Sequence, residues 1–288
     1  MRPRIVSRRE PAALKPAWRQ VHVGAKWPVR LLLVGLLLTV HLGPARAQDV
    51  PYLVKDINTA TDDSSPDGLT DVNGTLFFVA SDPTNGRELW KSDGTAAGTV
   101  LVKDIHPGSG DSSPYGLTDV NGTLFFAAFD PSNGTDLWKS DGTAAGTALV
   151  KDIDPGSGSS GPYELTNVNG TLFFAANGSE LWKSDGTEEG TVLVKDINPG
   201  SGGSGPDGLT NVNGTLFFRA FRTKGPELWK SDGTAAGTVL VRDINRGTAY
   251  PYALRGTNVN GTLLFTAFDP ETGLELWKSD GTAGERCS

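Results

Sequence analysis

The chain has 288 residues, of which 26 are basic and 33 acidic, and a formal net charge of −7. It contains one cysteine, Cys287, so the sequence can build neither a disulfide framework nor a thiolate metal site. The acidic balance repels polyanions, which excludes nucleic acid and anionic membrane surfaces as expected partners.

Residues 1–47 have the features of a secretory signal peptide. The apolar run from Leu31 to Leu42 follows basic residues, and Ala45 and Ala47 occupy the small-residue positions of a signal-peptidase site. The run is short for a bilayer span. We therefore expect cleavage after Ala47 and export to the periplasm, the cell surface or the medium, with no membrane span left. Removal of the signal leaves 17 basic and 32 acidic residues.

A repeated unit fills residues 48–283. The pair "LW" recurs at intervals of 44 to 48 residues, and "VNGTL" and "LVKDI" recur with the same spacing. A period of about 47 residues is typical of propellers, solenoids and arrays. The tryptophans of the five copies are Trp90, Trp138, Trp182, Trp229 and Trp277.

Each unit is predicted to hold four short strands. The first is "TVLVKDI", followed by a loop rich in Gly, Pro and Ser, and then by "GLTDV". An Asn-Gly hairpin turn joins "GLTDV" to "TLFF", and "ELWKSD" is the fourth strand. Because "TLFF" is apolar on both faces, it must be covered on both sides, as in stacked sheets.

We therefore predict an all-β protein, a β-propeller of five four-stranded blades that forms either a closed ring or an open arc. The alternatives are a β-solenoid and a string of small domains. The predicted blades span about 52–97, 98–145, 146–189, 190–236 and 237–283. Residues 284–288 form an atypical tail, where "SDGTAGERCS" replaces the usual continuation, and we interpret this as a truncation relative to a longer parent.

The turn sequence carries a family resemblance. The segments 88–99, 180–191 and 227–238 resemble the name motif of the bacterial ELWxxDGTxxGT repeat family. The copy at 136–147 has Asp136 in place of Glu, and the fifth copy lacks its second "GT". The resemblance covers about residues 52–283. It implies an exported, propeller-like repeat protein of unestablished activity, and it carries over no catalytic residue.

Two repeated residue types are predicted to be structural. A tryptophan at one place in every unit is expected to pack between blades, although a ring of sugar-stacking platforms is the alternative. The aspartates of "SDGT" are expected to accept backbone N–H groups in a turn. These aspartates are Asp93, Asp141, Asp185, Asp232 and Asp280. The Lys and Asp of "KDI" point to opposite strand faces, and we expect them to pair between neighbouring blades.

The loops after "KDI" offer candidate calcium ligands. Asp152 and Asp154, and likewise Asp196 and Asn198, place oxygen atoms two residues apart, as calcium loops do. The full alternating run that ends in a Glu is absent. We therefore expect no cofactor, with calcium as the candidate ion.

Catalytic constellations are sparse. After signal removal one histidine remains, His106, so a Ser-His-Asp centre or a His-rich metal centre is not expected. The sequence thus predicts a non-catalytic binding or interaction scaffold whose partner is a protein or a glycan at the cell surface. A multivalent lectin, with Tyr115 and Tyr163 facing the ligand, is the alternative. A glycoside hydrolase with paired carboxylates is the more distant one.

Overall fold

The computed structural model describes residues 50–281, except 61, 178–179, 201, 223–224, 243–255 and 270. The predicted signal peptide and the atypical tail lie outside the described residues. The described part is all-β, with 19 strands and no helix. The described residues therefore contain no helix long and apolar enough to cross a bilayer.

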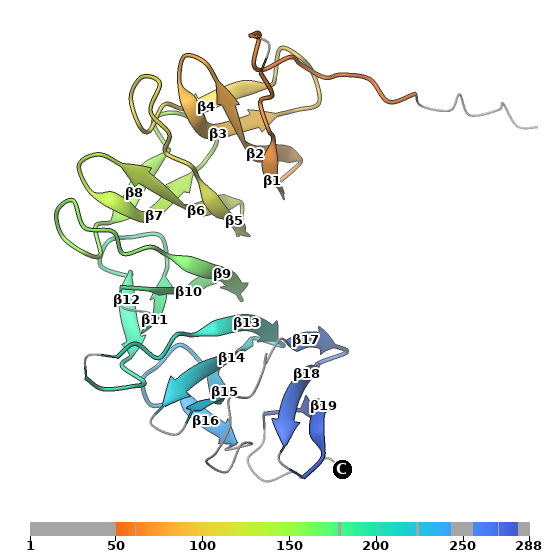
Figure 1. Ribbon diagram of the computed structural model, residues 1–288, viewed down its shortest axis with the longest axis vertical. Helices are drawn as coiled ribbons and strands as arrows, with labels where there is room; N and C mark the ends of the chain where they lie inside the picture. The colour runs from red at the N-terminus through yellow and green to blue at the C-terminus, as the bar shows by residue number, and fades with distance from the viewer. Residues whose placement is uncertain are drawn as a thin grey trace, which may run out of the picture. The chain divides into compact units, whose positions relative to one another are not determined.

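The strands fall into five sheets in chain order (Figure 1). The first strands are β1 (Asp67–Val72), β5 (Tyr115–Val120), β9 (Tyr163–Val168), β13 (Asp207–Val212) and β17 (Gly256–Val259). The second strands are β2 (Thr75–Asp82), β6 (Thr123–Asp130), β10 (Thr171–Ala176), β14 (Thr215–Arg222) and β18 (Thr262–Asp269). The third strands are β3 (Gly86–Ser92), β7 (Gly134–Ser140), β11 (Glu180–Ser184), β15 (Gly225–Ser231) and β19 (Gly273–Ser279). The fourth strands are β4 (Val100–Lys103), β8 (Ala148–Lys151), β12 (Val192–Lys195) and β16 (Val239–Arg242).

All pairs are antiparallel and sequential, so each sheet is a meander. The Asn-Gly turns form the predicted hairpins: Asn73 has φ 51° and Gly74 has φ 82°, and Val72 pairs with Thr75 across the turn. Positive φ at both positions matches the twist of the flanking strands.

The grouping of strands differs from the predicted units. The "LVK" strand closes a sheet instead of opening one, because β4 pairs with β3 of the preceding hairpin. The sheets thus span 67–103, 115–151, 163–195, 207–242 and 256–279, and the predicted boundaries near 97, 145, 189 and 236 fall inside sheets. The fifth sheet has three strands among the described residues.

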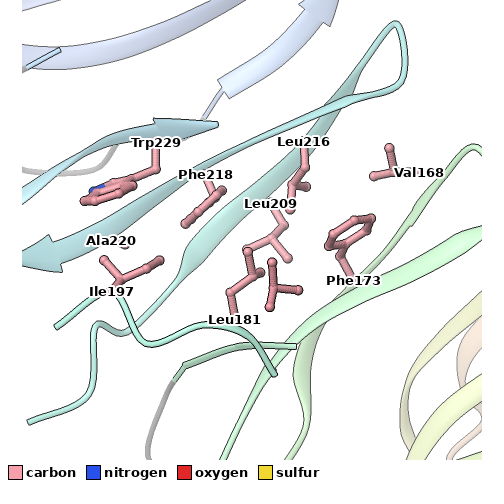
Figure 2. Packing of buried hydrophobic residues seen from close by; sticks show 10 residues of the cluster. Val168, Phe173, Leu181, Ile197, Leu209, Leu216, Phe218, Ala220 and Trp229 are labelled. Atoms are coloured by element: carbon pink, nitrogen blue, oxygen red, sulfur yellow. The ribbon is translucent and has the colours of Figure 1, made fainter. Parts of the chain in front are cut away.

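The hydrophobic core lies between consecutive sheets. Figure 2 shows one cluster, in which Phe173 and Leu181 of the third sheet face Leu216 and Phe218 of the fourth. Both phenylalanines are nearly free of solvent contact. This arrangement covers both faces of each "TLFF" strand, as its two apolar faces require.

The "SDGTxxGT" segment is a hydrogen-bonded turn. In the first copy, Asp93 Oδ1 accepts from Thr95 N (2.9 Å) and Thr95 Oγ1 (2.7 Å), and Ser92 Oγ lies 2.7 Å from Thr99 Oγ1. The next three copies repeat these bonds. Hydrogen bonds from Thr95 lower the pKa of Asp93, because they favour the charged carboxylate.

Lysines fasten each turn to the preceding sheet. Lys103 Nζ donates to Thr147 O (2.8 Å) and lies 5.7 Å from the ring centre of Trp138. Lys55, Lys151 and Lys195 make the equivalent bonds to the turns that follow them. The expected pairing of this lysine with the aspartate of "KDI" is therefore wrong: Asp104 instead accepts from Gly108 N (3.0 Å) in its own loop.

Candidate functional site

Four of the tryptophans lie in the packing between consecutive sheets, and Trp90 packs between the first sheet and Ile57. Trp90, Trp138 and Trp229 are 4–6% exposed, and Trp138 belongs to the apolar cluster between the first and second sheets. In this position the indole has no open face on which a sugar ring could stack. Trp182 and Trp277 also pack against buried clusters.

The glutamate of "ELW" has a role that the sequence analysis missed. Glu88 is fully buried, and its carboxylate accepts from Ile105 N (3.2 Å), His106 N (3.2 Å), Ser112 N (3.1 Å) and Ser112 Oγ (2.5 Å). It therefore holds the loop that leads to the next sheet. Glu180 holds Ile197 and Ser204 in the same way. We call this arrangement the carboxylate clamp.

Asp136 occupies the clamp position of the second sheet and fills it incompletely. Its Oδ1 accepts from Ile153 N (3.3 Å) and Ser160 Oγ (2.5 Å), while its Oδ2 is buried without a hydrogen-bond partner among the described residues. The aspartate side chain is one methylene shorter than that of Glu88, which explains the lost contacts. Burial raises the pKa of Asp136, and the nearby charges of Asp152 and Asp154 raise it further.

The candidate calcium ligands are used within their loops. Asp152 Oδ2 accepts from Gly156 N (3.0 Å), and Asn198 Nδ2 donates to Gly202 O (3.1 Å). Asp154 and Asp196 lie in the same two loops. Within the part of the chain that the structure describes, no three His, Cys, Asp or Glu side chains form a group that could hold a metal ion.

The units differ from one another at the beginnings of their first strands, as well as in the connectors that follow the "TLFF" strands. The first residue is Asp67 in β1, Tyr115 in β5, Tyr163 in β9 and Asp207 in β13, and Glu164 stands where the first, second and fourth copies have glycine. We call these five residues the variable row. The row is continuous because each first strand contacts the next one along the chain.

Hydrogen bonds between first strands fix the spacing of the row. Thr70 Oγ1 lies 3.4 Å from Leu117 O, and Thr118 Oγ1 lies 3.3 Å from Leu165 O. Glu164 Oε2 accepts from Leu209 N (3.2 Å) of the next first strand. These hydrogen bonds link β1 to β5, β5 to β9 and β9 to β13, so neighbouring residues of the row lie on consecutive first strands.

The two predicted ligand-facing tyrosines both belong to the variable row. Tyr115 is 41% exposed, and Tyr163 is half-buried. Their cross-strand partners are the small residues Ala127 and Ala175, so no large neighbour covers the rings from the adjacent strand. Burial and the charge of Asp136 raise the pKa of Tyr115, which keeps its phenol neutral at physiological pH.

Glu164 adopts a backbone conformation that is costly for a side-chain-bearing residue. Its φ is 58°, and the equivalent Gly68, Gly116 and Gly208 have φ values of 62–68°. A non-glycine residue in this region costs about 1 kcal/mol. The strain therefore sits at the position where the third unit departs from the repeat.

The ends of the row carry ion pairs. Arg219 makes a bidentate pair with Asp207, and its guanidinium lies 5.2 Å from the ring centre of Phe221. Arg87 Nη2 lies 3.8 Å from Asp67 Oδ2. The middle of the row, from Tyr115 to Glu164, thus combines aromatic rings with a carboxylate. Ammonium groups bind to such a combination through cation–π and charge contacts.

No protein-family model and no curated protein matches this sequence. Several solved structures are similar to it. Puromycin hydrolase is 18% identical over 76% of this chain and 36% of its own, with a TM-score of 0.48. The acylaminoacyl peptidase of Pyrococcus horikoshii is 12% identical over 79% and 39%, with a TM-score of 0.44. The β-propeller domain of the Trilobed protease from Pyrococcus furiosus is 9% identical over 72% and 64%, with a TM-score of 0.41.

These similarities correct the functional expectation. The sequence analysis predicted a non-catalytic scaffold, with a lectin or a glycoside hydrolase as alternatives, whereas the similar structures include a puromycin hydrolase and an acylaminoacyl peptidase. Both the scaffold function and the expected absence of catalysis are therefore contradicted. The chain spans less than two fifths of the length of these two enzymes. At these identities the likeness is one of fold and assigns no reaction to this chain.

Proposed function

We propose that the five sheets are the blades of one propeller, and that its variable row binds peptides through their amino groups and positions them for hydrolysis. The observation that carries this proposal is the row itself. It combines the exposed Tyr115 and the half-buried Tyr163 with a strained glutamate at a place where the repeat changes. The amine part of the proposal follows from the chemistry of the row, since aromatic rings beside carboxylates bind cationic amines. Peptides carry such amines at their N-termini and lysine side chains.

The charge of the whole chain supports a cationic ligand. The net charge is −7, and an acidic surface raises the local concentration of cations and their rate of association. Strain at Glu164 supports a functional role for that position, because glycine would fit the backbone without cost.

Peptide binding can be tested by calorimetry with a basic tetrapeptide and the same peptide with its amines acetylated. We expect the free-amine form to bind at least about tenfold more tightly, because acetylation removes the cation. Tyr115→Ala and Glu164→Gly should each weaken binding by about tenfold. Glu164→Gly should change the melting temperature little, since the relief of backbone strain is offset by the loss of the hydrogen bond from Leu209 N.

Leu193→Ala is the matched control, because Leu193 is 43% exposed but lies on β12, away from the row. It should bind like the parent. Equal affinity for the acetylated peptide, or parent-like binding by both row variants, would show that the row is not an amine site. Mass spectrometry of the peptide after incubation would show whether hydrolysis takes place on this chain.

We also propose that the chain is exported after removal of residues 1–47. The support is the apolar run and the small residues at Ala45 and Ala47. Intact mass spectrometry of protein recovered from the cell envelope or the medium should give a chain that begins at Gln48. A mass that includes residues 1–47 in that fraction would contradict cleavage.

A further inference from the structure

A pocket of about 180 Å³ lies between the third and fourth sheets. Val168 and Phe173, at one end of the buried cluster in Figure 2, form its apolar floor. Its polar wall comes from the Asn-Gly hairpins of both sheets and from the "SDGT" turn of the fourth sheet, through Asn169, Gly214 and Asp232. Sites for drug-sized ligands have volumes of about 300–1,000 Å³, so this inter-sheet pocket suits a smaller molecule.

Two opposite charges line the inter-sheet pocket from different sheets. Lys183 belongs to β11, and Asp232 directly follows β15. Among the described residues no ion pair joins the two side chains. Hydrogen bonds from Thr234 lower the pKa of Asp232, and the charge of Lys183 lowers it further. The two charges are therefore close enough to interact but too far apart to bond, which leaves room between them for a ligand.

Both charged groups keep bonding capacity for a ligand. Lys183 Nζ donates to Gly233 O (2.8 Å), and an ammonium group has two further N–H bonds. Asp232 Oδ1 accepts from Thr234 N and Thr234 Oγ1, each at 2.8 Å, whereas Asp232 Oδ2 has no hydrogen-bond partner in the described part of the chain. These bonds hold one cation and one anion in place on either side of the pocket, which lowers the cost of ordering them around a ligand.

The same pair of charges occurs between the earlier sheets. The equivalent pairs are Lys91 with Asp141 and Lys139 with Asp185. In each of them, hydrogen bonds within the turn lower the pKa of the aspartate, and the charge of the lysine lowers it further. Lys139 Nζ also donates to Gly186 O (2.8 Å), as Lys183 does to Gly233 O. The pair is thus a regular feature of the junction between sheets.

We propose that the inter-sheet pocket binds a small zwitterion, a free α-amino acid, with its carboxylate on Lys183 and its ammonium group on Asp232. A ligand with one charge would satisfy one of these groups and approach the like charge of the other, which costs affinity. A zwitterion forms a charge-assisted hydrogen bond with each. The apolar floor suits a small apolar side chain.

This site goes beyond the proposed peptide function and is separate from it in space. β9 begins at Tyr163 of the variable row and ends at Val168 of the pocket, so the two sites lie at opposite ends of that strand. Ligand binding at one site can therefore be measured without occupying the other.

Titration of the isotope-labelled full chain with L-alanine, followed by nuclear magnetic resonance, tests the proposal. We expect saturable shifts of the amides of Gly214 and Gly233, which line the pocket, and no comparable shift at Tyr163. L-Alanine methyl ester keeps only the cation, and N-acetyl-L-alanine keeps only the anion. Each should bind at least about tenfold more weakly than L-alanine, because each loses one charge-assisted hydrogen bond.

Variants of the two charged residues provide a second measurement. Lys183→Met and Asp232→Asn should each weaken the binding of L-alanine by about tenfold. Asp232→Asn keeps an oxygen that can accept from Thr234, so the turn is expected to stay folded. Lys195→Met is the matched control, because Lys195 Nζ donates to Thr238 O (2.7 Å) of the same "SDGTxxGT" segment but does not line the pocket. It should bind like the parent.

Shifts that do not saturate, or parent-like binding by both pocket variants, would overturn the proposal. An equal response to one singly charged analogue would show a simple ion site, and an equal response to glycerol would show a site for uncharged polar groups. Either result would overturn the zwitterion assignment. The amine site is tested separately at Tyr115 and Glu164, so a failure here would leave that proposal standing.

Discussion

Gly146→Ala is expected to lower the free energy of unfolding by about 2 kcal/mol. A Cβ atom at Gly146 would lie 2.1 Å from Asp141 Oδ1 and 2.2 Å from Asp141 Cγ. The carboxylate would have to move, which breaks its bonds to Thr143 N (2.8 Å) and Thr143 Oγ1 (2.7 Å). Because the φ of Gly146 is not positive, the penalty is steric and does not come from the backbone. Urea denaturation measures it.

A double-mutant cycle separates the clash from other effects of the alanine. In the Asp141→Ala background the carboxylate is absent, so Gly146→Ala should have little further effect on stability. An equal loss in both backgrounds would contradict the steric explanation. Gly202→Ala is a second control, since its Cβ would meet only the flexible side chain of Asn198 at 3.3 Å.

The pH dependence of this variant has a definite sign. Hydrogen bonds from Thr143 lower the pKa of Asp141 below its ordinary value of 3.8. A lowered carboxyl pKa stabilises the fold above pH 3.8, and this contribution is lost as the pH falls through the folded-state pKa. The stability difference between the parent and Gly146→Ala should therefore shrink in acid. A difference that stays constant down to pH 2 would argue against Asp141 as the affected group.

The repeat and its Asn-Gly hairpins could be predicted because both are local patterns. The Asn-Gly pairs need only their own backbone geometry to form a turn, and Asn73 and Gly74 have the required positive φ. The point at which one sheet ends and the next begins could not be predicted in the same way. A periodic sequence can be cut anywhere, and only the pairing of β4 with β3 shows that "LVK" ends a sheet.

The carboxylate clamp escaped the sequence analysis because its partners lie far along the chain. Glu88 bonds to Ser112, 24 residues later, in the loop that leads to the next sheet. A signal was present: serine recurs at this separation, as Ser160 follows Asp136 and Ser204 follows Glu180. The tyrosines of the variable row could be named as ligand-facing candidates from the sequence, and that role stays a prediction. The strain at Glu164 became visible only from its φ of 58°.

Glu88→Ala is expected to lower the free energy of unfolding by about 3 kcal/mol, because it leaves several buried N–H groups without an acceptor. The amides of Ile105, His106 and Ser112 all donate to this carboxylate. Glu88→Gln should lie between the parent and Glu88→Ala, since an amide nitrogen cannot accept from these donors. Glu189→Ala is the matched control: Glu189 is exposed, and the equivalent residue is Ala97 in the first copy.

In the second sheet, a substitution at the clamp position is expected to raise the free energy of unfolding. Asp136→Glu should raise the free energy of unfolding by about 1 kcal/mol, because the longer side chain can reach the loop amides as Glu88 does. It would also bring both carboxylate oxygens within reach of hydrogen-bond donors, whereas Asp136 Oδ2 is now buried without a partner among the described residues. Denaturation midpoints of the parent, Asp136→Glu and Asp136→Ala should rank with the glutamate highest and the alanine lowest. A glutamate variant no more stable than the parent would show that the shorter side chain, and not the clamp, is optimal in this sheet.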